Sequence, residues 1–234
     1  MDIELIADTV AADVSFEEGA SRLVGLMRML QRLPELSGGW RGLNGKWLVD
    51  GEDAFLAAAR EALSEEGAEI GMLSLVADSG LHLRADGVKA ERYLFFGQFG
   101  RAQIMPTHIK LGFAADLASL NLIRRVISVM LEWGWIQHIT VCDPYYAHMD
   151  SPLDPRRRGV GWAGWLPFSL ASGQVSEAMV LEPLAGGTFL ASVVDWDAND
   201  GRSIPRAQAL ELQLNGLGVL PTFDDLGRGD WGRR

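Results

Sequence analysis

Apolar side chains recur every three or four residues in four segments of the chain, and this spacing predicts four helices. The first begins at a capping box formed by Ser15 and Glu18 and ends before Pro34. The third is apolar around most of its circumference, which is typical of a helix buried on more than one side. The predicted helices cover residues 15–33, 52–66, 115–133 and 204–215.

A second pattern, short runs of apolar and β-favouring residues separated by Gly, Asp or Pro, predicts strands. Four such runs lie between residues 71 and 113, a fifth covers residues 135–143, and a hairpin turns at Gly186 and Gly187. Parallel neighbours need a crossover of about a dozen residues or more, so these short spacings indicate antiparallel pairing.

The order of these elements predicts an α+β fold with a mainly antiparallel sheet covered by helices. The sequence has no internal repeat and no obvious linker, so we expect a single domain over residues 1–222. Residues 223–234, rich in glycine and charge, are expected to form a flexible tail. Residues 144–155 have no periodicity and contain three prolines, which favours a surface loop.

Composition narrows the class of protein. The chain has 234 residues, of which 48% are hydrophobic and 22% charged, as in ordinary globular proteins. It contains no run of about 18 to 20 apolar residues and no secretory signal, so we expect no membrane span and a cytoplasmic location. The single cysteine, Cys142, rules out an internal disulfide. The net charge of −10 argues against direct nucleic-acid binding.

No residue pattern predicts a catalytic, cofactor or metal site. The best metal candidate combines His138, Cys142 and His148, but this spacing matches no standard zinc motif. A nucleophile formed by Cys142 and a histidine is equally weakly supported, since a cysteine in a strand is usually a small buried hydrophobe. We therefore expect no bound cofactor or metal and no catalysis.

Acidic residues cluster in the acidic turn, residues 195–200, which carries Asp195, Asp197 and Asp200. Their spacing superficially resembles a calcium loop, but the glycine and the terminal glutamate of such a loop are missing. Two interpretations remain, a solvated turn between strand and helix and an acidic patch that faces a partner.

A glycine–tryptophan stretch follows three consecutive arginines in the sequence. Gly161 and Gly164 alternate with Trp162 and Trp165, which disfavours a regular helix. We predict a bent edge strand whose indoles pack against glycine backbone. The tryptophans would serve as core residues or, alternatively, as part of an interface.

This stretch, "GVGWAGWLPF", and the later "GGTFLASVVDWDANDGRSIPRAQALELQLNGLGVLP" resemble immunity protein family fifty-two of bacterial polymorphic toxin systems. The N-terminal "SFEEGASRLVGLMRMLQRLPELSGGW" is also similar to that family. The resemblance implies a protein that neutralises a cognate toxin, a restriction-endonuclease-like nuclease delivered by type VI or related secretion, without catalysis of its own. An acidic inhibitor could then compete for the basic surface with which a nuclease holds phosphate.

Two alternatives stay open at this point. One is a small hydrolase that uses Asp195 or Asp197 with a nearby histidine. The other is a noncatalytic structural or adaptor domain.

Overall fold

The structure is a computed structural model, and it describes most of the C-terminal half of the chain and separate segments of the N-terminal half. The described residues are 2–10, 16–37, 40–42, 48–49, 52–57, 70–77, 82–83, 89–90, 93–100, 108–114, 118–228 and 231–232. The chain divides into two compact units, residues 1–10 with 115–234, and residues 11–114.

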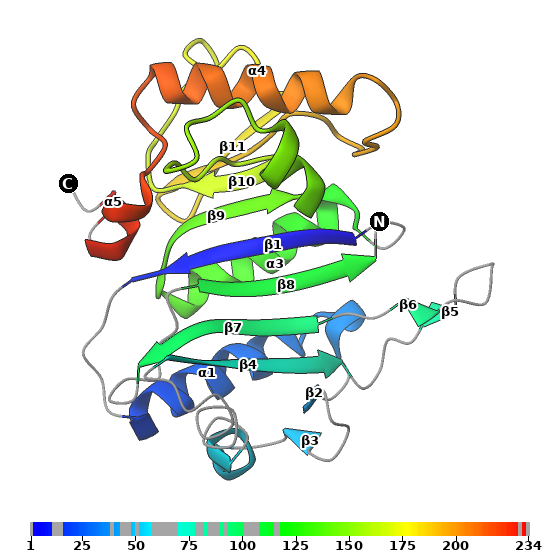
Figure 1. Ribbon diagram of the computed structural model, residues 1–234, viewed down its shortest axis with the longest axis vertical. Helices are drawn as coiled ribbons and strands as arrows, with labels where there is room; N and C mark the ends of the chain where they lie inside the picture. Colours follow the sequence, from blue (N-terminus) through cyan, green and yellow to red (C-terminus); the bar gives the residue numbers. More distant parts are fainter. Residues whose placement is uncertain are drawn as a thin grey trace. The chain divides into compact units, whose positions relative to one another are not determined.

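The first unit contains an antiparallel sheet in which the N-terminal strand pairs with a strand more than 120 residues away (Figure 1). Its strands follow the order β11-β12-β10-β9-β1, and each neighbouring pair is antiparallel. They are β1 (Asp2–Thr9), β9 (Ile136–Cys142), β10 (Ala163–Leu166), β11 (Val180–Leu184) and β12 (Gly187–Ala191).

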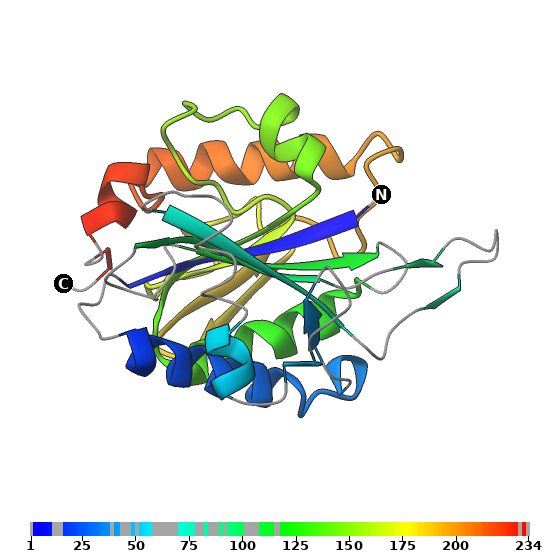
Figure 2. The ribbon, with the colours of Figure 1, turned by 60° about the horizontal axis from the view of Figure 1, so that its bottom comes forward.

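Two long helices cover this sheet from opposite faces, α3 (Leu120–Trp133) on one and α4 (Ser203–Gly216) on the other (Figure 2). Helix α3 begins where the Ser119 hydroxyl accepts a hydrogen bond from the Leu122 N–H, 3.2 Å away. It ends at Gly134, whose φ of +87° is a left-handed conformation that favours glycine.

Helix α4 packs on the sheet with the side chains that the sequence pattern assigns to its inner face. Leu210 and Leu214 join Leu166 of β10 and Leu190 of β12 in one buried cluster. Ala207, one turn earlier, packs in a second cluster with Cys142 at the end of β9. The 3.6-residue spacing of the apolar positions therefore determines which face of α4 is buried.

The second unit also combines an antiparallel sheet with a helix, α1 (Phe16–Leu30). Buried side chains of α1 recur at helical spacing: Ala20, Leu23, Val24, Leu26, Met27 and Leu30. Its main strands follow the order β8-β7-β4-β2-β3. They are β2 (Trp40–Gly42), β3 (Leu48–Val49), β4 (Ile70–Ala77), β7 (Tyr93–Gly100) and β8 (His108–Ala114). The remaining elements are β5 (His82–Leu83), which pairs with β6 (Lys89–Ala90), the short helix η1 (Pro34–Leu36) and a helix over residues 52–57.

The predicted α+β class with a mainly antiparallel sheet and covering helices is confirmed. Ser15 of the predicted capping box and residues 58–66 of the second predicted helix lie outside the described residues. The domain boundary at residue 222 stays a prediction. Beyond it the chain forms α5 (Phe223–Arg228), whose Leu226 is buried, and the Trp231 ring packs edge-on against Phe168.

Candidate functional site

The acidic turn lies between β12 and α4 and is exposed at all three predicted aspartates. The Asp200 carboxylate accepts hydrogen bonds from the backbone N–H groups of Arg202 and Ser203, 2.7 and 2.8 Å away, and these bonds lower its pKa. The Asp197 carboxylate accepts one from the Asn199 N–H at 2.8 Å. Asp200 therefore secures the start of α4, whereas Asp195 and much of Asp197 face solvent.

The segment predicted to be a surface loop, residues 144–155, contains a π-helical turn instead. This turn, η2 (Tyr146–Asp150), is held by Glu211 of α4, whose side chain reaches it from the adjacent helix. The Tyr146 hydroxyl donates to Glu211 at 2.8 Å, and the Ser151 hydroxyl donates to the same carboxylate oxygen at 3.0 Å. The sequence pattern could not predict this turn, because the residues that hold it lie far apart in the sequence and form no local repeat.

Glu211 is a fully buried carboxylate, only 1% exposed. Its second oxygen accepts the Gly161 N–H at 2.9 Å, so one side chain connects α4, η2 and the glycine–tryptophan stretch. Burial raises the pKa of Glu211, and these hydrogen bonds counter that rise. The sequence pattern gave no signal for this residue beyond a charge on the inner side of a predicted helix.

Trp196, in the middle of the acidic turn, connects this turn to η2. Its ring lies edge-on to Tyr146 with a centroid distance of 5.7 Å, and 6.5 Å from the ring of Trp162. Next to these contacts, three large apolar side chains are exposed: Tyr145, Met149 and Val194. We call five exposed residues in or next to η2 and the acidic turn the composite surface: Tyr145, Met149, Val194, Asp195 and Asp197.

The predicted burial of the two tryptophans is confirmed, since Trp162 is 1% and Trp165 6% exposed. The prediction of an edge strand is wrong, because β10 pairs with β9 on one side and β12 on the other. Both indole N–H groups are satisfied, Trp162 by the Val193 carbonyl at 2.9 Å and Trp165 by the Leu184 carbonyl at 2.8 Å. This burial favours the core interpretation of the tryptophans.

The glycines of this stretch are required by close backbone approach. A Cβ atom at Gly161 would lie 2.6 Å from the Cys142 Cβ atom, and Gly161 has a φ of +63°. A Cβ atom at Gly164 would lie 2.4 Å from the Ile139 carbonyl oxygen. A side chain at either position would push β10 or its flank away from β9.

A buried polar network, which the sequence pattern did not reveal, connects three segments of the first unit. Asp8 of β1 lies directly opposite His138 of β9, and its carboxylate is 3.3 Å from the His138 Nδ1 atom. The second Asp8 oxygen accepts a hydrogen bond from Arg158 at 3.2 Å, and the Arg158 guanidinium lies 4.9 Å from the Phe223 ring centroid. The partner of His138 is therefore Asp8, rather than an aspartate of the acidic turn.

His138 predicts a pH dependence of stability. It is completely buried, and desolvation lowers its pKa below the ordinary 6.5 although Asp8 raises it. Below pH of about 6.5 the unfolded chain takes up a proton that folded His138 does not bind. Stability should therefore fall as the pH decreases through this range, by at most about 1.4 kcal/mol per pH unit.

The measurement is the free energy of unfolding in urea between pH 5 and 8. The slope should be smaller in His138→Gln than in the wild type, because the variant lacks the buried imidazole whose pKa is lowered. Equal slopes for His138→Gln and the wild type would contradict the conclusion that burial lowers the pKa of His138.

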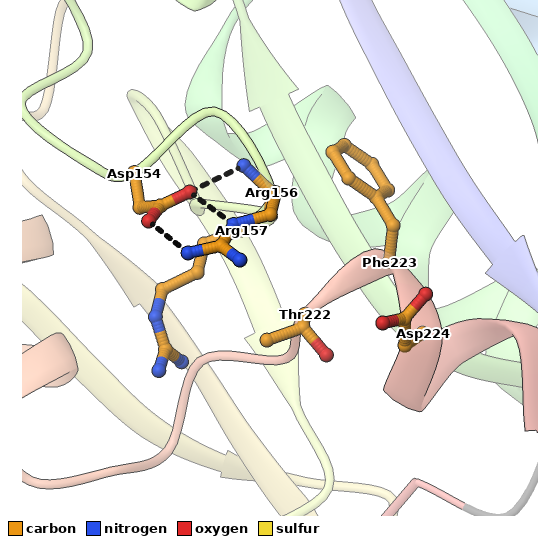
Figure 3. Close-up of a pocket in the computed structure, with 6 residues that line it drawn as sticks. All are labelled: Asp154, Arg156, Arg157, Thr222, Phe223 and Asp224. Carbon is orange, nitrogen blue, oxygen red and sulfur yellow. Dashed lines mark hydrogen bonds and ion pairs between the residues drawn. The ribbon is translucent and has the colours of Figure 1, made fainter.

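A cavity of about 250 Å³ lies beside this network, between residues 154–157 and the start of α5. Figure 3 shows its lining: Asp154, Arg156, Arg157, Thr222, Phe223 and Asp224. Asp154 accepts two side-chain hydrogen bonds from Arg156, at 3.1 and 2.9 Å. Two arginines and two aspartates line the cavity, so the formal charges of its lining balance, and the Arg157 guanidinium donates to the Leu220 carbonyl at 2.9 Å.

The residues of the predicted metal candidate are not brought together. His138 and Cys142 are buried in β9, whereas His148 is exposed in η2. Burial raises the pKa of Cys142 to about 12, which keeps this thiol protonated at neutral pH. Within the part of the chain that the structure describes, no group of three His, Cys, Asp or Glu side chains is arranged to hold a metal ion. Over the same residues, no helix is both long and apolar enough to cross a membrane.

No protein-family model and no curated protein matches the chain. The resemblance to immunity protein family fifty-two is therefore not confirmed. Among solved structures, the chain is similar to the Pseudomonas aeruginosa T6SS protein PA0821, with 13% sequence identity and a TM-score of 0.48. The match covers 92% of this chain and 72% of that chain. Similarity at this level does not transfer a function from one chain to the other.

Proposed function

We propose that the protein is an immunity protein that binds and neutralises a cognate toxin, a nuclease of the restriction-endonuclease-like type, without catalysis of its own. The observation that carries the proposal is the acidic turn, which is exposed and fixed at its end by Asp200. The sequence resemblance supplies the kind of partner, and the net charge of −10 favours a basic one.

In this proposal, Asp195 and Asp197 occupy the basic groove with which the nuclease holds phosphate. Charge complementarity of this kind raises the association rate, and charge pairs that become desolvated also slow dissociation. The Asn199 N–H bond to Asp197 and the Asp200 contacts with α4 hold the turn in one conformation. Less conformational entropy is then lost on binding.

The hydrolase alternative has no specific support. It requires a histidine bonded to Asp195 or Asp197. His138 is buried and bonds to Asp8 instead, and among the described residues no hydrogen bond joins His148 of η2 to either aspartate. The absence of catalysis stays a prediction.

The test removes the charges of the acidic turn while retaining its geometry. Asparagine can accept the same backbone hydrogen bonds as aspartate, so Asp195→Asn with Asp197→Asn should leave the fold intact. Asp200→Asn is tested alone and in combination with this pair, and it measures separately how much the Asp200 contacts at the start of α4 contribute to binding. The charge-matched control is Glu17→Gln with Glu132→Gln, two exposed positions outside the turn.

The proposal predicts that a toxin gene lies beside the gene for this chain, and the probe is the catalytically inactivated product of that toxin gene. If the turn occupies the groove, the Asp195/Asp197 pair of substitutions should weaken binding at both low and high salt and abolish protection of cells. If the turn only steers association, the loss should disappear once salt screens the charges. Full protection with unchanged binding kinetics at low salt would remove the turn from the interface.

A further inference from the structure

The η2 segment exposes two large apolar side chains on the same side. Tyr145, which immediately precedes η2, is 63% exposed, and Met149 is 67% exposed. They are four residues apart, close to one π-helical turn, so both side chains project in a similar direction. π-Helical turns are rare and occur frequently at functional sites.

These side chains project from a fixed backbone. The Tyr145 N–H donates to the Asp143 carboxylate at 2.9 Å, and the Asp150 carbonyl accepts from the Gln208 side chain at 2.7 Å. Between these two points, Tyr146 is buried and donates to Glu211. The backbone that carries Tyr145 and Met149 is therefore already ordered, and little backbone conformational entropy would be lost when a partner binds these side chains.

The same segment adjoins the acidic turn. Tyr145 is next to Tyr146, and Asp195 and Asp197 flank Trp196 in the sequence. The edge-on contact between the Tyr146 and Trp196 rings therefore places apolar and acidic exposed residues in one region. Interfaces commonly combine aromatic or methionine anchors with surrounding charged residues.

We infer that Tyr145 and Met149 are the apolar anchors of an interface formed by the composite surface. The protein that binds this surface is the basic toxin, which presents an apolar pocket bordered by Lys or Arg. This inference rests on the proposed function and adds to it the residues that determine the lifetime of the complex. Asp195 and Asp197 complement the basic border, whereas Tyr145 and Met149 fill the pocket.

A second copy of this chain is a poorer occupant. In a two-fold dimer across the composite surface, each copy would bring Asp195 and Asp197 into the same interface. Like charges at such an interface are repulsive, and each chain carries a net charge of −10.

The test measures the affinity for the inactivated neighbouring toxin with Tyr145→Ala, Met149→Ala and the double variant. All three should fold normally, since both side chains are exposed, and an unchanged melting temperature checks this. The dissociation constant of the double variant should rise at least about 30-fold, mainly through faster dissociation and at both low and high salt. Met179→Ala with Leu217→Ala, two other exposed apolar positions, is the matched control and should bind like the wild type.

The outcomes separate this inference from the proposed function. If the wild-type protein does not bind the toxin, both are wrong. If the wild type binds and the double variant binds equally tightly, the anchors are wrong and the proposed function stands. If sedimentation shows that the wild type self-associates and that only self-association is lost in the double variant, the composite surface pairs two copies and the inference is overturned.

Discussion

Replacing Trp162 with alanine is expected to lower the free energy of unfolding by about 3 to 5 kcal/mol. The side chain is among the largest that are fully buried, and its ring centroid lies 6.5 Å from that of Trp196. Truncation would remove this packing and leave the Val193 carbonyl without the indole N–H that it accepts. Urea unfolding monitored by circular dichroism measures the change.

Two variants control this result. Trp162→Phe retains an aromatic ring but loses the N–H group and some volume, so its loss should be clearly smaller than that of Trp162→Ala. Leu212→Ala, at an exposed position of α4, should change stability by no more than about 0.5 kcal/mol. An unchanged unfolding curve for Trp162→Ala would show that this tryptophan is not a core residue.

Replacing Glu211 with alanine is expected to lower the free energy of unfolding by about 3 kcal/mol, because it removes a buried hydrogen-bond acceptor. Three donors would lose their acceptor: the Tyr146 and Ser151 hydroxyls and the Gly161 N–H. An unsatisfied buried donor costs about 1 to 3 kcal/mol, but the two hydroxyls can rotate to other acceptors, which limits the total. Urea unfolding measures the loss.

Glu211→Gln is the matched control, because its amide oxygen can still accept the Gly161 N–H and its amide group can donate to a hydroxyl. It should cost less than Glu211→Ala. Limited proteolysis adds a local readout, with faster cleavage near η2 expected in Glu211→Ala. Equal stability of the alanine variant and the wild type would contradict the role of Glu211 in connecting α4, η2 and the glycine–tryptophan stretch.

Local patterns in the sequence were sufficient for the elements that depend on periodicity. The spacing of Ala207, Leu210 and Leu214 predicts α4 and its buried face, and the structure buries all three. Short strands separated by turn residues predict antiparallel pairing, which each unit shows. The glycines around Trp162 and Trp165 likewise predict close packing, and Gly161 and Gly164 lie against β9 where a side chain would not fit.

The neighbours of each strand could not be predicted, because strand order depends on contacts between distant residues. The prediction of an edge position for the tryptophan stretch fails for this reason, since β12 and β9 both pair with β10. The pairing of Asp8 with His138 depends on the same long-range register. Nothing local in the sequence connects either residue with Arg158.

The η2 turn was missed for a different reason. A single π-helical turn is too short to produce an apolar repeat, and the prolines around it indicate a loop. Its position is fixed by Glu211 and Gln208 on a helix that begins more than 50 residues later. The acidic turn, in contrast, could be located from its composition, although the role of Asp200 at the start of α4 required the structure.

Co-expression with the neighbouring toxin tests the central claim most directly. Cells that induce the active toxin are plated with the wild-type protein, with the Asp195→Asn/Asp197→Asn variant, or with an empty vector. We expect the wild type to restore colony formation and the variant, present at equal levels, not to do so. Death of cells that express the wild-type protein at the same level as its toxin would contradict the proposed immunity function.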